Sequence, residues 1–322
     1  MVGKSLVGET IRLLLSALAP STQATYLRFW KFGSRYCESR QISPLVNATE
    51  KDWDIDILNF LTWEYSVVKI GGSGLTTRFG AIQFLHSMEG KAEFDHKTHR
   101  IHSLIAAVMG KGDTKQQLPV NPDLLRWGAD RMSSYEGAMW KAREVWAAIL
   151  VGFHFALRIS EIEGLEDRDI SFQDDGKHKS VTIMIRGSKT DQKRLGVRRT
   201  LTATNCDLCP FHTMARWLDL KGWRPNYGES LFSRNIATRI NHTSKELASE
   251  NGSGAKRFST HSLRAGCATT LYAAGVDPID IQRWGRWKSA IYMRYIWRDN
   301  LSLHHLSQAL TANTRFGGPF WS

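Results

Sequence analysis

Cysteine is scarce in this chain of 322 residues, which contains only four. That number is too small for a disulfide framework in a chain of this length, so we expect a reducing compartment. The compartment would be the cytoplasm of a prokaryote or phage host, or the nucleus if the source is eukaryotic, and secretion is not expected. The cysteines are Cys37, Cys206, Cys209 and Cys267.

Long apolar runs are missing as well. No stretch reaches the roughly 20 apolar residues that a membrane-spanning helix needs, so no membrane partner is expected. The apolar start of the chain could be mistaken for a signal peptide. Glu9 and Arg12 interrupt it, however, and an amphipathic helix explains it better.

Acidic residues are outnumbered. The chain has 31 Asp and Glu residues against 43 Lys and Arg residues, which gives a formal net charge of +12. Such an excess favours a polyanionic partner, and nucleic acid more than a membrane surface. Hydrophobic residues make up 42% of the chain. This is enough for packed cores, and the length allows two domains of ordinary size.

A complete set of zinc ligands is also lacking. Cys206-x-x-Cys209 followed by His212 offers three ligands, but a structural zinc site needs four. We therefore interpret this stretch as a loop that enters a helix with Pro210 in its first turn. No metal and no cofactor are expected.

Strand-like alternation is missing from the first third of the chain, which instead reads as helices joined by turns. One helix is expected to begin at Ser21 or Thr22. A capping box of Thr49 and Asp52 would begin another. The sequence thus predicts a small helical domain.

The domain boundary is expected in a polar stretch that is rich in Gly and Pro and shows no periodicity. We assign residues 1–112 to the helical domain and 113–123 to a linker. Residues 124–322 then form a second domain with a C-terminal tail.

The second domain contains a long apolar stretch, residues 140–157, which predicts a buried central helix. It runs into Arg158, and burying a guanidinium group without a partner is unfavourable. Glu161, three residues later, could be that partner. Residues 179–203 alternate as a β-hairpin, and one further short strand is expected beside it. The hairpin tip holds Lys189.

Three consecutive short helices are expected between residues 258 and 297. Thr260 precedes the first helix, and Gly275 is suited to its C-terminus. Asp277 and Pro278 predict the start of the second helix. That helix would stop at Gly285, and a third short helix would follow.

Polar and aromatic side chains on these helices could converge on one anion. His261 and Arg264 are three residues apart and share a helix face. With Trp287 and Tyr295 they could bind a phosphodiester, because an Arg fork holds two oxygens and a Tyr hydroxyl can act as a nucleophile. Taken singly, each of these residues is also explained as a helix cap, a solvated side chain or a core residue.

As a set, the motifs HSLR, GRW and RYI closely resemble the C-terminal signature of the tyrosine recombinases, the phage integrase family. The resemblance implies a mainly α fold with a small antiparallel β-sheet. It would combine an N-terminal all-α SAM-like core-binding domain with an α+β catalytic domain. It also implies catalytic roles for Arg158, Lys189, His261, Arg264, Trp287 and Tyr295.

The resemblance also implies a chemical role for each of these residues. The resemblance makes Tyr295 the nucleophile that forms a 3′-phosphotyrosyl link, and Lys189 the general acid. Glu161 would orient Arg158. Two alternatives stay open: Lys193 in place of Lys189, and Tyr292 in place of Tyr295. The second arises because the spacing from Trp287 to Tyr295 is one residue shorter than the commonest family spacing. Trp284, which precedes the turn at Gly285, is assigned to the core.

Double-stranded DNA is the implied partner, bound by a homotetramer on two DNA sites for recombination or integration. The alternatives are a type IB topoisomerase or telomere resolvase, a domesticated DNA-binding protein that does not cleave, and a basic helical scaffold. Polar residues on two candidate helices and at the hairpin tip suit phosphate or base contacts. They are Thr76, Thr77, Arg78, Lys97, Arg100, Lys193 and Arg194.

Overall fold

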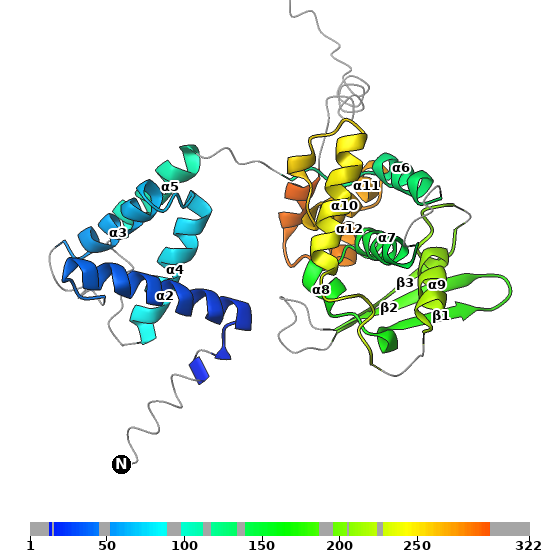
Figure 1. Ribbon diagram of the computed structural model, residues 1–322, viewed down its shortest axis with the longest axis horizontal. Coiled ribbons are helices and arrows are strands. Elements are labelled where there is room, and N and C mark those ends of the chain that lie inside the picture. Colours follow the sequence, from blue (N-terminus) through cyan, green and yellow to red (C-terminus); the bar gives the residue numbers. More distant parts are fainter. Residues whose placement is uncertain are drawn as a thin grey trace, which may run out of the picture. The chain divides into compact units, whose positions relative to one another are not determined.

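The structure, a computed structural model, describes eight stretches of the chain and residues 13 and 14 near its start (Figure 1). These are residues 13, 14, 16–44, 52–88, 98–111, 117–133, 139–186, 196–204, 206–223 and 228–296. The chain divides into two compact units, Met1–Thr114 and Lys115–Ser322.

The first unit contains four described helices: α2 (Pro20–Arg40), α3 (Asp54–Ser66), α4 (Gly72–Met88) and α5 (His99–Lys111). Aromatic and aliphatic side chains from all four helices form one core, and its largest members include Tyr36, Phe60, Phe79 and Ile101. No strand occurs in the described part of this unit, in agreement with the sequence prediction.

Two helix starts in this unit differ from the prediction. Helix α2 begins at Pro20, slightly before Ser21 and Thr22, because proline fits the first turn of a helix. Helix α3 begins after Trp53, and no side chain caps it. The predicted capping box therefore does not start α3 at Asp52, and Thr49 lies outside the described residues.

The second unit is mainly helical. Its α-helices are α6 (Pro122–Ser133), α7 (Met139–His154), α8 (Ile159–Glu163), α9 (Pro210–Lys221), α10 (Ile236–Glu250), α11 (His261–Ala273) and α12 (Pro278–Gly285). Its described residues also form three short 3₁₀ helices: η1 (Asp167–Asp169), η2 (Ala255–Arg257) and η3 (Ala290–Tyr295). The three consecutive helices predicted near the C-terminus are thus α11, α12 and η3.

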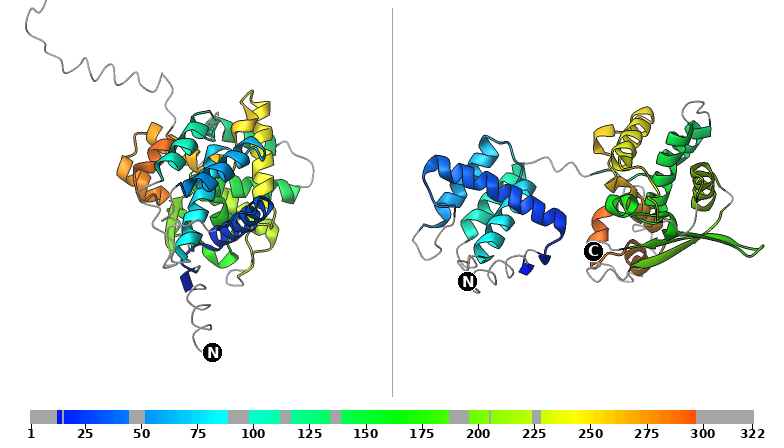
Figure 2. Two further views of the ribbon diagram at one scale, coloured as in Figure 1. Left: turned by 90° about the vertical axis from the view of Figure 1, so that its left-hand side faces the viewer. Right: turned by 60° about the horizontal axis from the view of Figure 1, so that its bottom comes forward.

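A three-stranded antiparallel sheet completes this unit, with strand order β1 (Ile170–Asp174), β2 (Lys179–Ile185) and β3 (Val197–Thr202). The predicted hairpin and the further short strand are both present. Val181 lies opposite Phe172 on β1 and Leu201 on β3. One face of β2 is buried, as its alternation predicts, and α9 packs against β2 and β3 (Figure 2).

Helix α7 is the centre of the second unit, and α9, α10 and α11 all pack against it. Residues 147–151 of α7 are almost completely buried, as expected for an apolar helix that is covered on several sides. None of the described helices is long and apolar enough to cross a membrane. The fold class predicted from the sequence is confirmed.

The predicted linker, residues 113–123, is wrong at its C-terminal end. Residues 117–121 pack along the second unit, where the N–H of Leu118 donates to the carbonyl of Arg257 and that of Val120 to the carbonyl of Ser262. Val120 is only 2% exposed. The polar composition of this stretch does not distinguish a free linker from an extended segment that packs on its own domain.

Candidate active site

The turn after α7 holds the arginines of the site in place. The chain leaves the helix through Ala156, whose φ of 48° lies in the left-handed region. This conformation is unfavourable for a residue with a Cβ atom. It leaves the carbonyl oxygen of Ala156 to accept hydrogen bonds from two guanidinium groups, those of Arg264 and Arg286.

Arg158 lies at the end of this turn, directly before α8. Its Nη1 donates to Oε1 of Glu161 at 2.9 Å, and its backbone N–H donates to Oε2 of the same carboxylate, also at 2.9 Å. The ion pair expected from the sequence is therefore present. The Arg158 side chain is 24% exposed, whereas the Glu161 carboxylate is buried beneath it.

Glu161 also binds a second guanidinium group. Nη2 of Arg286, the residue that follows α12, donates to Oε2 of Glu161 at 2.6 Å. One buried carboxylate is thus shared by Arg158 and Arg286. Shared carboxylates of this kind fix the orientation of the guanidinium groups that they hold.

Arg264, on the buried face of α11, is only 1% exposed. Its Nη1 and Nη2 donate to the carbonyls of Ala156 and Gly285. The guanidinium carbon lies 4.3 Å from the centroid of the Trp287 ring, within cation–π range. Of the two predicted phosphate-binding arginines, Arg158 therefore lies at the surface of the site and Arg264 beneath it.

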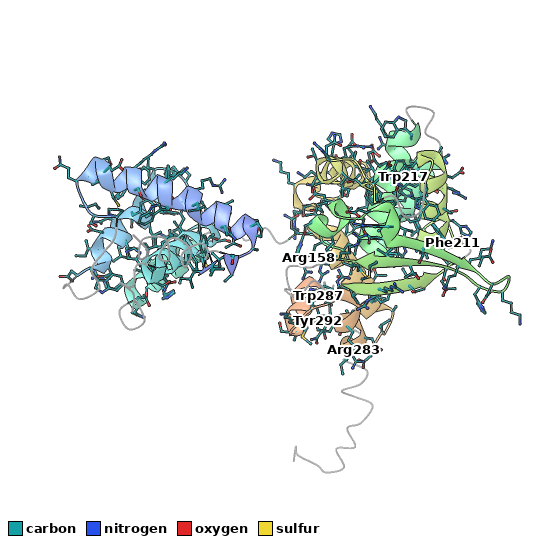
Figure 3. All side chains as sticks on the ribbon, turned by 90° about the horizontal axis from the view of Figure 1, so that it is seen from below. Arg158, Phe211, Trp217, Arg283, Trp287 and Tyr292 are labelled. Carbon is teal, nitrogen blue, oxygen red and sulfur yellow. The ribbon has the colours of Figure 1, made fainter. Side chains whose placement is uncertain are left out.

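Trp287 is held tightly. Its ring lies over Gly285, where a Cβ atom would fall 1.7 Å from Cζ3 of the indole. Its other neighbours include Tyr292, with ring centroids 5.9 Å apart. Trp284 packs into the core as predicted, stacked on Phe155 at 6.2 Å. Figure 3 shows Arg158, Trp287 and Tyr292 in the same region of the unit.

His261 is the first residue of α11 and is accessible to solvent. Partial burial of the ring lowers the pKa of His261, and the positive charges of Arg264 and Arg158 lower it further. The imidazole is therefore neutral at neutral pH and can accept a proton. The same interactions place His261 within electrostatic reach of both arginines.

Several predicted residues lie outside the described part of the chain. They are Lys97, Lys189, Lys193 and Arg194. Tyr295 is the last residue of η3, and the structure describes its backbone but not its side chain. The rival nucleophile, Tyr292, is buried against Trp287.

Cys209 is buried at the start of α9, where its sulfur accepts a hydrogen bond from the N–H of Thr204 at 3.3 Å. Cys206 is exposed. Across the described residues, no three side chains of the His, Cys, Asp and Glu types come together as a metal site would require.

The catalytic unit also carries a sequence match to a known family. A profile of the phage integrase family matches residues 141–299. The chain belongs to the tyrosine recombinases. An integrase/recombinase XerD homologue of Selenomonas ruminantium is 29% identical over 165 residues. The match spans 48% of this chain and 47% of that relative, about half of its length.

Solved structures of tyrosine recombinases share the fold. A Tn1549 transposon integrase in complex with circular intermediate DNA has a TM-score of 0.61 at 15% identity, and the match covers 95% of this chain and 98% of the other. A lambda integrase dimer bound to a COC′ core site has a TM-score of 0.56 at 14% identity, with 92% and 98% covered.

In this tyrosine recombinase, the candidate DNA-binding residues of the first unit are placed unequally. Thr76 and Thr77 are exposed residues, and their hydroxyls donate to backbone carbonyls one turn earlier in α4. Arg100 is exposed and donates to Asp54 at 3.2 Å. These three residues remain candidates for DNA contacts.

Arg78 is placed differently, and its prediction needs correction. Its Nε pairs with the buried carboxylate of Glu64, and its guanidinium carbon lies 4.2 Å from the centroid of Phe29. The side chain is only 12% exposed. A contact between Arg78 and DNA does not fit this placement, because the guanidinium group is used to satisfy a buried carboxylate.

Two arginines of the second unit were not predicted. Arg286 shares Glu161 with Arg158, as described above. Arg199, on β3, donates to the carbonyl of Arg283 at 2.8 Å, and burial lowers the pKa of its guanidinium. The GRW motif pointed to Trp287 and gave no reason to select the arginine before it. No local pattern marks Arg199.

Proposed function

We propose that this chain is a site-specific DNA recombinase or integrase that cleaves and rejoins DNA through a 3′-phosphotyrosyl intermediate on Tyr295. One observation carries the proposal. Arg158 and Arg264, which are more than 100 residues apart in the sequence, meet at the turn around Ala156, within electrostatic reach of His261, and Trp287 stacks on Arg264. Such a cluster suits the negative charge of a phosphodiester.

Cleavage would proceed by transesterification. The hydroxyl oxygen of Tyr295 forms a bond to the phosphorus, and the bond from phosphorus to the 5′ oxygen breaks. The neutral imidazole of His261 takes the phenolic proton. Lys189, with Lys193 as the alternative, gives a proton to the leaving 5′ oxygen.

The arginines would stabilise the transition state. Charge builds up on the non-bridging oxygens as the phosphorus becomes pentavalent, and fixed guanidinium groups stabilise that charge without reorganising. Arg158 is oriented for this role by Glu161. Arg264 acts from beneath, stacked on Trp287. In the second step a 5′ hydroxyl oxygen attacks the phosphorus, loses its proton and displaces the oxygen of Tyr295, which is protonated again. The bond that forms and the bond that breaks are both phosphoesters of comparable energy.

Duplex DNA is the proposed partner, and a homotetramer on two DNA sites is the proposed assembly. The net charge of +12 supports a polyanionic partner. Thr76 and Thr77 on α4 and Arg100 on α5 are exposed and would contact DNA from the first unit. Lys97, Lys193 and Arg194 lie outside the described residues and stay predicted DNA contacts, the last two near the expected hairpin tip.

The nucleophile is tested by trapping. Wild-type protein is incubated with a pool of nicked duplexes of random sequence, and a covalent protein–DNA adduct is isolated and mapped by mass spectrometry. Tyr295→Phe should abolish the adduct and leave DNA binding unchanged. Tyr292→Phe is the matched control and should still form it, because Tyr292 is buried against Trp287.

The outcomes separate the alternatives. An adduct on Tyr292 would move the nucleophile to that residue. No adduct from the wild-type protein with any duplex, together with normal DNA binding, would indicate a DNA-binding protein that does not cleave. Relaxation of supercoiled DNA without recombinant product would indicate a topoisomerase.

A further inference from the structure

Arg286 occupies a backbone position that favours glycine. It follows α12 with φ 59° and ψ 41°, and its N–H closes the helix by donating to the carbonyls of Gln282 and Arg283. Glycine is the usual residue at such a left-handed helix end. An arginine is disfavoured there by its backbone, so its side-chain contacts must account for its presence.

Those contacts fasten the guanidinium group of Arg286 over the turn that leads into Arg158. Nη2 donates to Oε2 of Glu161 at 2.6 Å and to the carbonyl of Ala156 at 3.2 Å, and Nη1 donates to the carbonyl of Phe155 at 3.3 Å. The side chain is only 9% exposed. Its Nε has no hydrogen-bond partner among the residues that the structure describes.

The charges around Glu161 do not balance. Among the described residues, Glu161 is the only carboxylate that pairs with either Arg158 or Arg286. Two guanidinium groups against one carboxylate leave one positive charge without a counter-charge. A largely buried positive charge of this kind is unfavourable until an anion approaches, and a phosphodiester carries one negative charge.

We propose that Arg286 is a positioning residue of the phosphate-binding site. It holds Oε2 of Glu161 while Oε1 of the same carboxylate holds Arg158, and it adds a positive charge behind the arginine that faces the phosphate. This inference rests on the proposed function, because it assigns the phosphate of the cleaved strand to this cluster. The burial and the neighbouring positive charge of Arg158 that lower the pKa of Arg286 are consistent with it.

Two variants separate the charge from the turn. Arg286→Gly keeps the left-handed turn, which glycine adopts without strain, and removes only the side chain. Arg286→Lys keeps a positive charge and loses the forked geometry. Arg283→Met is the matched control, because Arg283 lies in the last turn of α12 with a side chain that is 77% exposed.

The decisive readout compares two substrates. One is a nicked duplex taken from the trapped pool. The other is the same duplex with a neutral methylphosphonate at the cleaved position, which lacks the charge that Arg286 would offset. On the phosphodiester, Arg286→Gly should lower adduct formation about 100-fold or more, and Arg286→Lys should recover part of it. On the methylphosphonate, the loss should be less than about tenfold.

Three results would overturn the inference. They are equal losses on the two substrates, activity of Arg286→Gly equal to that of Arg283→Met, and failure of both Arg286 variants to fold. In the first and third cases Arg286 would be a structural residue that ties α12 to the turn. Melting curves of each variant distinguish misfolding from loss of chemistry.

A measurement without DNA keeps this inference separate from the proposed function. Orthovanadate, a mimic of pentavalent phosphorus, is titrated into each protein and followed by vanadium NMR. Wild type and Arg283→Met should broaden its signal, and Arg286→Gly should not. If vanadate binding depends on Arg286 but no DNA adduct forms, the proposed function is contradicted and this inference is not. If an adduct forms on Tyr295 but vanadate binding does not depend on Arg286, this inference is contradicted and the proposed function is not.

Discussion

At the scale of single residues, Ala156 shows how the site determines an unusual backbone conformation. Its left-handed φ of 48° costs about 1–2 kcal/mol for a residue with a Cβ atom. The conformation is retained because its carbonyl receives two guanidinium groups. Stability is thus lost locally at the turn that anchors the arginines proposed to bind the phosphate.

This strain makes a prediction about Ala156→Gly. The variant loses a buried methyl group, worth about 0.8 kcal/mol, and gains chain flexibility, worth about 0.5–1 kcal/mol. Relief of the left-handed strain offsets both losses. We expect a free energy of unfolding within about 1 kcal/mol of wild type, measured by urea denaturation.

Ala148→Gly is the control, because Ala148 is equally buried but lies within helix α7. It suffers the same two losses with no relief, so we expect it to lose about 1.3–1.8 kcal/mol. Equal losses for the two variants would show that Ala156 is not strained.

The same scale shows what the sequence could and could not predict. The Arg158–Glu161 pair was predictable, because three-residue spacing and the need of a buried guanidinium group for a partner both point to it. Arg286 was not predictable. Its role depends on a left-handed conformation that its residue type disfavours, and on a carboxylate 125 residues away.

At the scale of elements, the turn between α12 and η3 depends on Gly285. A Cβ atom at this position would lie 1.7 Å from Cζ3 of Trp287, which is far too close for non-bonded atoms. The indole ring, which lies against Arg264, would have to shift. We therefore expect Gly285→Ala to cost about 1–3 kcal/mol of stability, as overpacking does, and to lower adduct formation at the same time.

Gly254→Ala is the control for this prediction. The nearest atom to a Cβ at residue 254 is 3.8 Å away, an ordinary contact, and its φ of −67° suits any residue. We expect a change below about 0.5 kcal/mol. Thermal unfolding and adduct trapping measure both variants. A Gly285→Ala protein with normal stability and activity would contradict the packing that we describe.

Helix ends that are marked by a capping residue in the sequence were predicted well. Helix α12 begins where Asp277 accepts a hydrogen bond from the N–H of Ile279, and α11 is followed by Gly275 with φ of 76°. Both features depend on residue type alone. The start of α3 and the path of residues 117–121 depend on tertiary packing instead, so the sequence did not predict them correctly.

At the scale of the whole molecule, two compact units and an excess of positive charge predict how DNA binding responds to salt. Each phosphate that is neutralised releases counterions, so affinity falls steeply as salt concentration rises. Between 50 and 200 mM salt we expect the Kd for duplex DNA to rise at least about tenfold, measured by fluorescence anisotropy.

The fragment 115–322 provides the comparison. It contains its own hydrophobic core, so we expect it to unfold cooperatively by itself. It should bind DNA more weakly than the whole chain and with a shallower salt dependence, because the phosphate contacts of the first unit are gone. A whole chain whose affinity ignores salt would not have an interface dominated by phosphates.

The turn between α7 and α8 also bears on how a damaged copy would behave. Arg264 of α11 and Arg286 after α12 both donate hydrogen bonds to the carbonyl of Ala156 in this turn. They thereby tie the segment from α11 to η3, which ends at Tyr295, to the turn. Under the proposed function, detachment of that segment would displace the residue proposed as nucleophile together with the arginines proposed to bind the phosphate. A misfolded copy would then fail to cut DNA at all, rather than cut it and leave the break unsealed.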